Sequence, residues 1–214
     1  MTKEIKIKLL KVFLVVFLVL FIDQFFKIWI KTNLMIGESI RVLDWFYILS
    51  IENNGMAFGM ELFDKMFLTF FRIIAVVAIG YYVYYTIKKG FNFGFTVAIA
   101  LIFAGALGNI IDCVFYGVLF NSSEGQVAVF LPEVGGYAPL FQGRVVDMLY
   151  FPLIDTTWPS WMPSVGGTRF TFFDPVFNIA DSVICFGVFY ILLFQRKYIL
   201  NSDKKERLNK EEDI

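Results

Sequence analysis

Two aspartates lie where a carboxylate is unusual, and together they are suited to acid–base chemistry. Asp181 immediately precedes an apolar run, residues 182–194, that is typical of a membrane-spanning helix. An ionisable side chain at the edge of a bilayer is costly and marks a candidate functional site. Asp147 lies in the segment that leads to this run. We therefore interpret Asp147 and Asp181 as a catalytic pair.

Two neighbouring carboxylates can perform peptide hydrolysis by sharing a proton. When they lie about 3 Å apart they cannot both ionise easily, so the pair holds one proton. The ionised member can deprotonate a water that attacks a peptide carbonyl, while the protonated member donates toward the carbonyl oxygen. Because the titration belongs to the pair, the sequence does not assign the two roles to individual residues.

The chain contains no histidine, which excludes several common mechanisms. Ser-His and Cys-His nucleophile pairs need an imidazole base, and His-x-x-x-His zinc sites need imidazole ligands. Acid–base chemistry then depends on carboxylates, lysine, tyrosine or cysteine. Cys113 and Cys185 both lie inside apolar stretches, where thiols usually act as small buried hydrophobes rather than as a disulfide.

The composition indicates an integral membrane protein. Hydrophobic residues make up 58% of the 214 residues and charged residues 18%, a balance too apolar for an ordinary soluble domain. The length suits one domain. A helix needs about 20 apolar residues to cross the hydrocarbon core. We predict an all-α membrane protein with four transmembrane helices, at about 9–30, 66–87, 91–115 and 179–198.

Two regions between the predicted spans do not have a helical pattern. Residues 40–51 are rich in β-branched and aromatic side chains and predict short strands, which end in an Asn54-Gly55 turn. Residues 117–176 hold all six prolines and predict a long loop, whose Trp158 and Trp161 favour the headgroup layer of a membrane. The predicted fold therefore adds a small β-rich segment and a long loop on the outer face of the four helices.

The positive charges indicate the orientation in the membrane. Twelve of the nineteen basic residues would share one side of a four-span protein: Lys3, Lys6, Lys8, Lys11, Lys88, Lys89, Arg196, Lys197, Lys204, Lys205, Arg207 and Lys210. By the positive-inside rule this side is the cytoplasm. We predict that residues 1–200 form the membrane domain and that residues 201–214 form a charged cytoplasmic tail. Both aspartates and the β-rich segment then face outward.

Polar residues inside the predicted spans are further site candidates. Asp23 and Lys27 are four residues apart on one helical face and can form an ion pair, either as a structural pair or with a direct role near a substrate. Asn109 and Asp112, three residues apart, are also neighbours on a helix. They follow a small-residue stretch, 105–108, that lets helices approach closely. This second pair is either a helix–helix contact or part of a site.

Five motifs occur in the order that is typical of one protein family. They are Asp23-Gln24-x-x-Lys27, Asn54-Gly55-x-Ala57-Phe58-Gly59, Gly105-Ala106-Leu107-Gly108-Asn109-x-x-Asp112, Gly143-x-Val145-Val146-Asp147 and Phe177-Asn178-x-Ala180-Asp181. With these motifs the chain resembles the lipoprotein signal peptidases (signal peptidase II), a family of bacterial membrane aspartyl proteases. The resemblance covers all four predicted spans in their order.

This resemblance implies a specific reaction and site. It implies that Asp147 and Asp181 cleave diacylglyceryl-modified prolipoproteins just before the lipidated cysteine, in the bacterial cytoplasmic (inner) membrane. It also implies no metal, no cofactor and no nucleic-acid partner, a monomer surrounded by membrane lipids, and inhibition by the cyclic peptide globomycin. The residues that it implies as substrate-binding or site-supporting are Asp23, Lys27, Asn54, Gly55, Asn109, Asp112 and Asn178.

The sequence differs from the family pattern in two places. The family usually has an arginine directly after the aspartate of the third span, where this chain has Cys113. Arg72 and Arg144 are candidate replacements, because both are charged and lie near the membrane. Residues 117–142 and 152–176 are longer than the usual family connections. They resemble insertions on the outer face that shape substrate choice or form a lid.

Rival residues and rival functions stay open at this point. The insertions bring in Asp155 and Asp174 as further carboxylates, although Asp174 precedes Pro175 and more typically begins a turn. One alternative function is a non-catalytic lipoprotein-binding protein, in which Cys113 has disabled the chemistry. Another is a small transport membrane protein. A transporter is expected to carry ionisable groups near mid-bilayer and an internal repeat, and we find neither pattern in the sequence.

Overall fold

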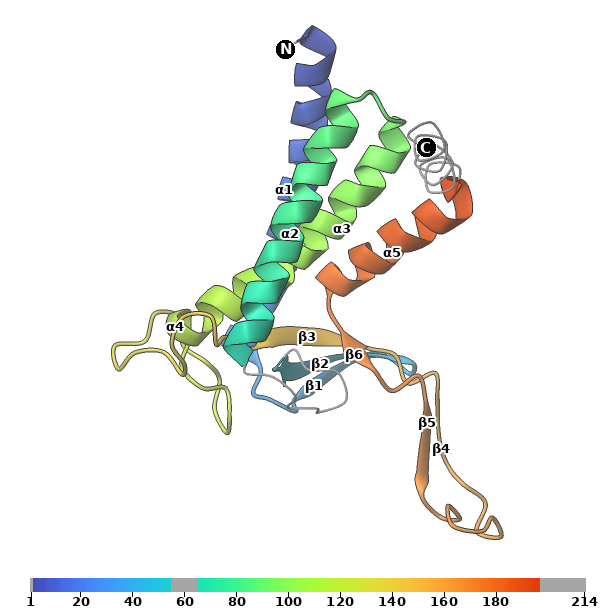
Figure 1. Ribbon diagram of the computed structural model, residues 1–214. Coiled ribbons are helices and arrows are strands. Elements are labelled where there is room, and N and C mark those ends of the chain that lie inside the picture. Colours follow the sequence, from blue (N-terminus) through green and yellow to red (C-terminus); the bar gives the residue numbers. More distant parts are fainter. Residues whose placement is uncertain (1, 55–64, 197–214) are drawn as a thin grey trace, which may run out of the picture.

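Long helices form one end of the molecule and a small sheet forms the other (Figure 1). The structure, a computed structural model, describes residues 2–54 and 65–196. Helices lie at all four positions predicted as spans: α1 (Lys3–Asn33), α2 (Lys65–Lys88), α3 (Phe93–Ile111) and α5 (Ile179–Phe194). α3 continues through a π-helical turn, η2 (Asp112–Tyr116), into the short α4 (Gly117–Leu119).

Two of the helices in the described residues are long and apolar enough to cross a membrane. They are α2 and the continuous helix Phe93–Leu119. α5 is apolar but shorter, and the end of its predicted span, 197–198, lies outside the described residues. α1 presents an exposed row of stacked phenylalanine rings, Phe13, Phe17, Phe21 and Phe25. An apolar outer surface of this extent is typical of contact with lipid or with another protein.

The strands predicted at residues 40–51 are confirmed, and they belong to a larger sheet. β1 (Ser39–Leu43) pairs with β2 (Phe46–Asn53), and β2 pairs with β3 (Val145–Tyr150). β6 (Val176–Phe177) completes the antiparallel order β1-β2-β3-β6. In this register Ile51 lies opposite Asp147.

The prediction of one unbroken loop over residues 117–176 is wrong. This segment contributes β3 and β6 to the sheet, and it also forms a separate hairpin from β4 (Ile154–Thr157) and β5 (Arg169–Phe172). The hairpin projects away from the sheet (Figure 1). Short strands between Pro- and Gly-rich turns carry a weak local signal, and β3 is stabilised by pairing with β2, which lies far away in the sequence.

A hydrophobic core joins the sheet to the base of the helices. Its buried members come from the end of α1, from η2 and the segment after it, and from β3: Ile30, Leu34, Tyr116, Phe120, Ala128, Val146 and Met148. Val146 and Met148 flank Asp147, and alternation along a strand points them to the opposite face from Asp147. The core therefore fixes the face on which Asp147 lies.

Glycines on α3 bring the helices together near Asp181. A Cβ atom at Gly105 would lie 2.4 Å from the backbone oxygen of Ala180, and one at Gly108 would lie 2.7 Å from a carboxylate oxygen of Asp23. Neither distance is sterically possible, so both positions need glycine. The predicted close approach of helices at residues 105–108 is confirmed, and it places the start of α5 against α1 and α3.

Both cysteines are free, as expected. Cys113 is buried in the π-helical turn, whereas Cys185 is exposed on the outer side of α5. The prediction that both thiols are buried is therefore wrong for Cys185. Along α5 the cavity-lining Ile184 precedes Cys185 and the exposed Phe186 follows it. The apolar pattern of a membrane helix does not distinguish such inner and outer positions.

Candidate active site

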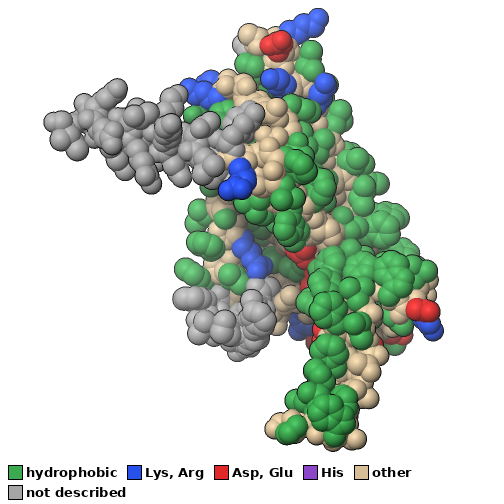
Figure 2. All heavy atoms as spheres, turned by 90° about the vertical axis from the view of Figure 1, so that its right-hand side faces the viewer, with side chains coloured by type: hydrophobic (Ala, Val, Ile, Leu, Met, Phe, Trp, Pro, Cys, Tyr) green, Lys and Arg blue, Asp and Glu red, His purple; other side chains and the backbone are tan. Residues whose placement is uncertain are grey.

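A cavity of about 410 Å³ lies between the helices and the sheet. Figure 2 shows acidic side chains at this junction, with hydrophobic side chains on both sides. The cavity is lined by α2, α3, α5 and the ends of β2 and β3, through Asn53, Arg72, Ala75, Val76, Ile79, Ala106, Asn109, Ile110, Val145, Asp147, Asp181 and Ile184. Both predicted aspartates are therefore in one cavity. The rivals Asp155 and Asp174 are not among its lining residues.

Asp147 is held on β3 by two amide groups. Asn178 Nδ2 donates to Asp147 Oδ1 at 2.7 Å, and Asn53 Nδ2 donates to Oδ2 at 3.4 Å. The residue is only 4% exposed. Burial and the nearby negative charge of Asp181 raise the pKa of Asp147 to about 7, and these effects outweigh the two donors, which lower it. Asp147 is thus suited to hold a proton near neutral pH.

Asp181 is the third residue of α5 and takes part in its capping box. The Asp181 N–H donates to Asn178 Oδ1 at 2.9 Å, and Asp181 Oδ2 accepts from the Asn178 N–H at 3.3 Å. Asn109 Nδ2 donates to Asp181 Oδ1 at 2.8 Å. A carboxylate in the first turn of a helix is stabilised by free N–H groups and by the helix dipole. The site therefore fixes the orientation of this carboxylate.

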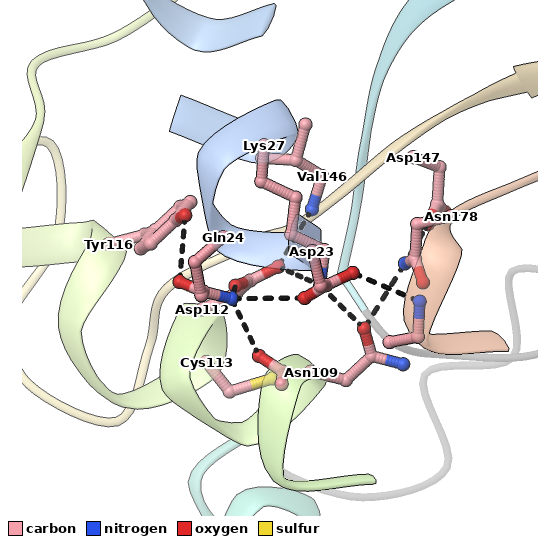
Figure 3. A network of polar contacts seen from close by, with 12 residues as sticks. Asp23, Gln24, Lys27, Asn109, Asp112, Cys113, Tyr116, Val146, Asp147 and Asn178 are labelled. Atoms are coloured by element: carbon pink, nitrogen blue, oxygen red, sulfur yellow. Dashed lines mark hydrogen bonds and ion pairs between the residues drawn. The ribbon is translucent and has the colours of Figure 1, made fainter. Parts of the chain in front are cut away.

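Two asparagines connect the aspartates. Asn178 is fully buried and donates through the same Nδ2 both to Asp147 and, at 3.1 Å, to Asn109 Oδ1. Asn109 in turn donates to Asp181. The result is a continuous polar chain from Asp147 through Asn178 and Asn109 to Asp181, most of which can be followed in Figure 3. Each amide has both a donor and an acceptor in use, which fixes its rotation.

A buried ammonium lies behind this chain. Lys27 Nζ is 3.0 Å from Asp23 Oδ2 and 2.8 Å from Asp112 Oδ2, and it donates to Asn109 Oδ1 at 2.8 Å. The predicted Asp23–Lys27 ion pair is confirmed, and the side chains of Lys27, Asp23 and Asp112 are essentially inaccessible to solvent. Burial of three charges is costly unless every one of them is paired and hydrogen-bonded, as it is here.

The ion cluster holds the backbone beside each aspartate. Asp23 Oδ1 accepts from the N–H of Ala180 at 2.9 Å, and Asp112 Oδ2 accepts from the N–H of Val146 at 3.3 Å. These two residues directly precede Asp181 and Asp147 in the sequence. The two carboxylates bound to Lys27 therefore set the positions of both dyad candidates. Figure 3 shows this arrangement on the side of Val146 and Asp147.

Sequence reasoning missed two members of this cluster. Gln24 Nε2 donates to Asp112 Oδ1 at 2.9 Å, to Asp23 Oδ2 at 3.1 Å and to the backbone oxygen of Gly108 at 3.2 Å. The Tyr116 hydroxyl donates to Gln24 Oε1 at 3.0 Å. Their positions in the sequence could have indicated both residues, because Gln24 adjoins Asp23 and Tyr116 lies one helical turn after Asp112.

The structure places Asn53, rather than Asn54, next to Asp147. Asn53 is two residues from Ile51, the strand partner of Asp147, so the two side chains share one face of the sheet. Asn54 is exposed and accepts from Lys65 Nζ at 3.1 Å, and it is not among the residues that line the cavity. Its substrate-binding role stays a prediction. Gly55 lies outside the described residues.

The structure separates the two candidate arginines. Arg144 pairs with Glu124 at 2.8 Å and approaches Glu52 at 3.6 Å, and it does not line the cavity. Arg72 lines the cavity, with Nη1 3.6 Å from Cys113 Sγ.

Comparison with known proteins identifies the family. The model of the signal peptidase (SPase) II family, Peptidase_A8, matches residues 15–196. The chain belongs to this family. It is therefore an aspartic peptidase with lipoprotein signal peptidase activity, which removes signal peptides from prolipoproteins. The resemblance seen in the five motifs is confirmed.

Individual relatives can be aligned with nearly the whole length of this chain. The chain is 47% identical over 196 residues to a lipoprotein signal peptidase of Porphyromonas gingivalis, with 89% of this chain and 85% of the relative aligned. It is 36% identical over 197 residues to one of Staphylococcus aureus, covering 91% and 93%. A solved structure of a bacterial membrane enzyme matches with a TM-score of 0.58 at 30% identity, covering 89% and 90%. The protein is accordingly a helical bacterial membrane enzyme with a β-sheet region.

Replacing Lys27 tests whether the buried ion cluster stabilises this site. Lys27→Met leaves the carboxylates of Asp23 and Asp112 buried without a counter-charge, so we expect the free energy of unfolding to fall by about 3–5 kcal/mol. Thermal unfolding in detergent micelles measures the effect. Adding Asp23→Asn and Asp112→Asn to Lys27→Met should recover part of the loss, because no uncompensated charge then remains.

The matched control is Arg41→Gln, which breaks the exposed ion pair with Asp44. This change should alter stability by less than about 1 kcal/mol. A Lys27→Met enzyme as stable as the wild type would show that the buried cluster does not stabilise the fold.

Proposed function

We propose that Asp147 and Asp181 form the catalytic dyad of this peptidase and cleave diacylglyceryl-modified prolipoproteins just before the lipidated cysteine. One observation carries the proposal: both carboxylates line the same cavity and are joined by the amides of Asn178 and Asn109. The relatives named above are lipoprotein signal peptidases. Both aspartates line the cavity between the sheet and the helices, which supports their assignment as the dyad.

The environments of the two aspartates support different roles. Asp147 carries the shared proton, because burial and the charge of Asp181 raise its pKa to about 7. Asp181 acts as the base toward water, because N–H donors from Asn178 and Asn109 orient its carboxylate in the cavity. This assignment refers to the resting state of the pair, since coupled groups exchange the proton during turnover.

The reaction then follows in two balanced steps. Asp181 takes a proton from a water whose oxygen bonds to the scissile carbonyl carbon, while Asp147 gives its proton to the carbonyl oxygen. The resulting gem-diol collapses as the carbon–nitrogen bond breaks. Asp181 returns its proton to the leaving nitrogen, and Asp147 takes the proton of one diol hydroxyl. Both aspartates regain their starting states, and the steps require no metal or cofactor.

The lining of the cavity supports a lipid-modified substrate. Away from the aspartates it presents apolar side chains of α2, α3 and α5, including Val76, Ile79 and Ile184. The acyl chains of the substrate can then stay in the membrane while the peptide bond reaches the dyad. The cyclic peptide globomycin would compete for this same cavity, and a monomer surrounded by membrane lipids would suffice because all the polar groups named here come from one chain.

We further propose that α1, α2, the helix Phe93–Leu119 and α5 all cross the bacterial cytoplasmic membrane, with both termini in the cytoplasm and the dyad near the outer face. Figure 1 supports this topology, since the start of α1, the α2–α3 connection and the end of α5 lie at one end of the molecule and the sheet lies at the other. Among the described residues, the first of these ends carries Lys3, Lys6, Lys8, Lys11, Lys88, Lys89 and Arg196.

Substitution of either aspartate tests the dyad directly. Asp147→Asn and Asp181→Asn should each lower the rate of cleavage of a purified diacylglyceryl-modified prolipoprotein by about 10²–10⁴-fold, because each removes a group that transfers a proton. Asp174→Asn is the control, and it should cleave at nearly the wild-type rate because Asp174 does not line the cavity. Wild-type turnover by both dyad variants would show that the dyad is misassigned.

The pH dependence of activity follows from the pKa of Asp147. The shared proton is present below a pH of about 7 and is lost as the pH rises through this value, so kcat/KM should fall on the alkaline side. Asn53 donates to Asp147 and lowers its pKa. Asn53→Ala should therefore move the alkaline limb to higher pH, whereas Asn33→Ala, an exposed control, should not. A limb that moves to lower pH would contradict the assignment.

Labelling from outside the cell tests the topology. In a Cys185→Ser background, a membrane-impermeant maleimide should label Trp161→Cys in spheroplasts, because this residue is 78% exposed at the tip of the hairpin. Lys3→Cys should react only after the membrane is permeabilised. Labelling of Lys3→Cys in sealed spheroplasts would place the N-terminus outside and overturn the proposed orientation.

A further inference from the structure

Arg72 is a charged residue in a helix that is otherwise suited to lipid. Between Lys65 and Lys88, the ends of α2, it is the only charged residue, and the helix is long and apolar enough to cross a membrane. A guanidinium in such a segment is costly, and such residues usually face the interior of the protein and mark a functional site. Arg72 follows this rule, because it is partly buried and lines the cavity.

The guanidinium lies in the same cavity as the two aspartates. Asp147 enters from β3, Asp181 from α5 and Arg72 from α2, so three separate elements contribute charged groups to one cavity of about 410 Å³. Arg72 Nη1 also contacts Cys113 Sγ at 3.6 Å. This contact connects α2 to the π-helical turn that begins at Asp112.

We propose that Arg72 binds the substrate of this peptidase, and that its guanidinium donates hydrogen bonds to substrate carbonyl oxygens beside the scissile bond. The inference rests on the proposed function of the cavity. A guanidinium has five N–H donors in a planar fork and no acceptor, so it recognises acceptor oxygens. The substrate offers two kinds of carbonyl there: those of the peptide backbone and those of the diacylglyceryl esters.

The surroundings of Arg144 exclude it from this role. Its guanidinium pairs with Glu124 and Glu52 and lies 5.6 Å from the ring centroid of Tyr137, outside the cavity lining. Arg72, in contrast, reaches the side chain of residue 113 from a different helix. The guanidinium of Arg72 therefore lies 3.6 Å from the side chain at the position where the family pattern predicts an arginine.

The contact with Cys113 makes this replacement testable by exchange. Arg72→Gln should lower kcat/KM for a diacylglyceryl-modified prolipoprotein by about 10- to 100-fold, the usual effect of losing hydrogen bonds from a charged donor. The kcat/KM of Arg72→Lys should lie between that of Arg72→Gln and that of the wild type. The double variant Arg72→Gln with Cys113→Arg should recover much of the loss, because the side chains of residues 72 and 113 are in contact and the second can then carry the guanidinium.

A substrate analogue with ether-linked chains identifies the acceptor, since it lacks the ester carbonyls. If the ester carbonyls accept the hydrogen bonds, the wild-type kcat/KM should be lower on the ether analogue than on the ester substrate, by the factor that Arg72→Gln causes on the ester substrate. Arg72→Gln should then have the same kcat/KM as the wild type on the analogue. If the peptide carbonyls accept the hydrogen bonds, Arg72→Gln should lower kcat/KM by the same factor on the ester substrate and on the ether analogue. Either result supports the proposal and names the carbonyl.

Two results would overturn the proposal. One is wild-type kcat/KM for Arg72→Gln on both substrates. The other is a loss that Cys113→Arg does not reduce and that accompanies a lower Tm, which would show that Arg72 only supports the fold. The control is Arg41→Gln, an exposed arginine on β1. Full activity of Asp147→Asn would contradict the dyad instead, so failure of the two proposals can be distinguished.

Discussion

The buried ammonium of Lys27 is the interaction on which the arrangement of this site depends. It compensates the carboxylates of Asp23 and Asp112, which also accept hydrogen bonds from the backbone N–H groups of Ala180 and Val146. A charge without a partner inside a protein costs several kcal/mol, so these three groups have few arrangements available to them. Each N–H belongs to the residue before one aspartate of the proposed dyad. The pairing of the buried charges therefore also constrains the positions of Asp147 and Asp181.

The helices and the small sheet contribute different groups to the cavity. The helices supply Asp181 and Arg72 at the wall of an apolar cavity, and the sheet supplies Asp147 at its edge. The proposed cleavage of a lipid-modified substrate uses both, because the scissile bond is polar while the acyl chains would stay in the hydrocarbon. The core formed by Ile30, Tyr116 and Val146, among others, holds the sheet against the helices.

In our proposal, the charge that the family pattern places at residue 113 comes from Arg72, at another position in the sequence. A family pattern describes the residue type at each sequence position. A substrate contacts the functional groups that line the cavity, whatever their positions in the sequence. α2 passes close enough to the π-helical turn for Arg72 to contact Cys113. The side chain of arginine is long and flexible, so a neighbouring helix can bring a guanidinium to the side chain of residue 113.

The sequence by itself determined the helical segments, the strands near residue 45, the ion pair of Asp23 with Lys27 and the two aspartates of the proposed dyad. These follow from local patterns: apolar length, β-branched composition, helical spacing and motif order. Only the tertiary structure decided that β3 pairs with β2, that Asn53 rather than Asn54 reaches Asp147, and that Gln24 and Arg72 join the site. These depend on contacts between residues far apart in the sequence, such as Gln24 with Asp112 and Asn53 with Asp147, which no local pattern encodes.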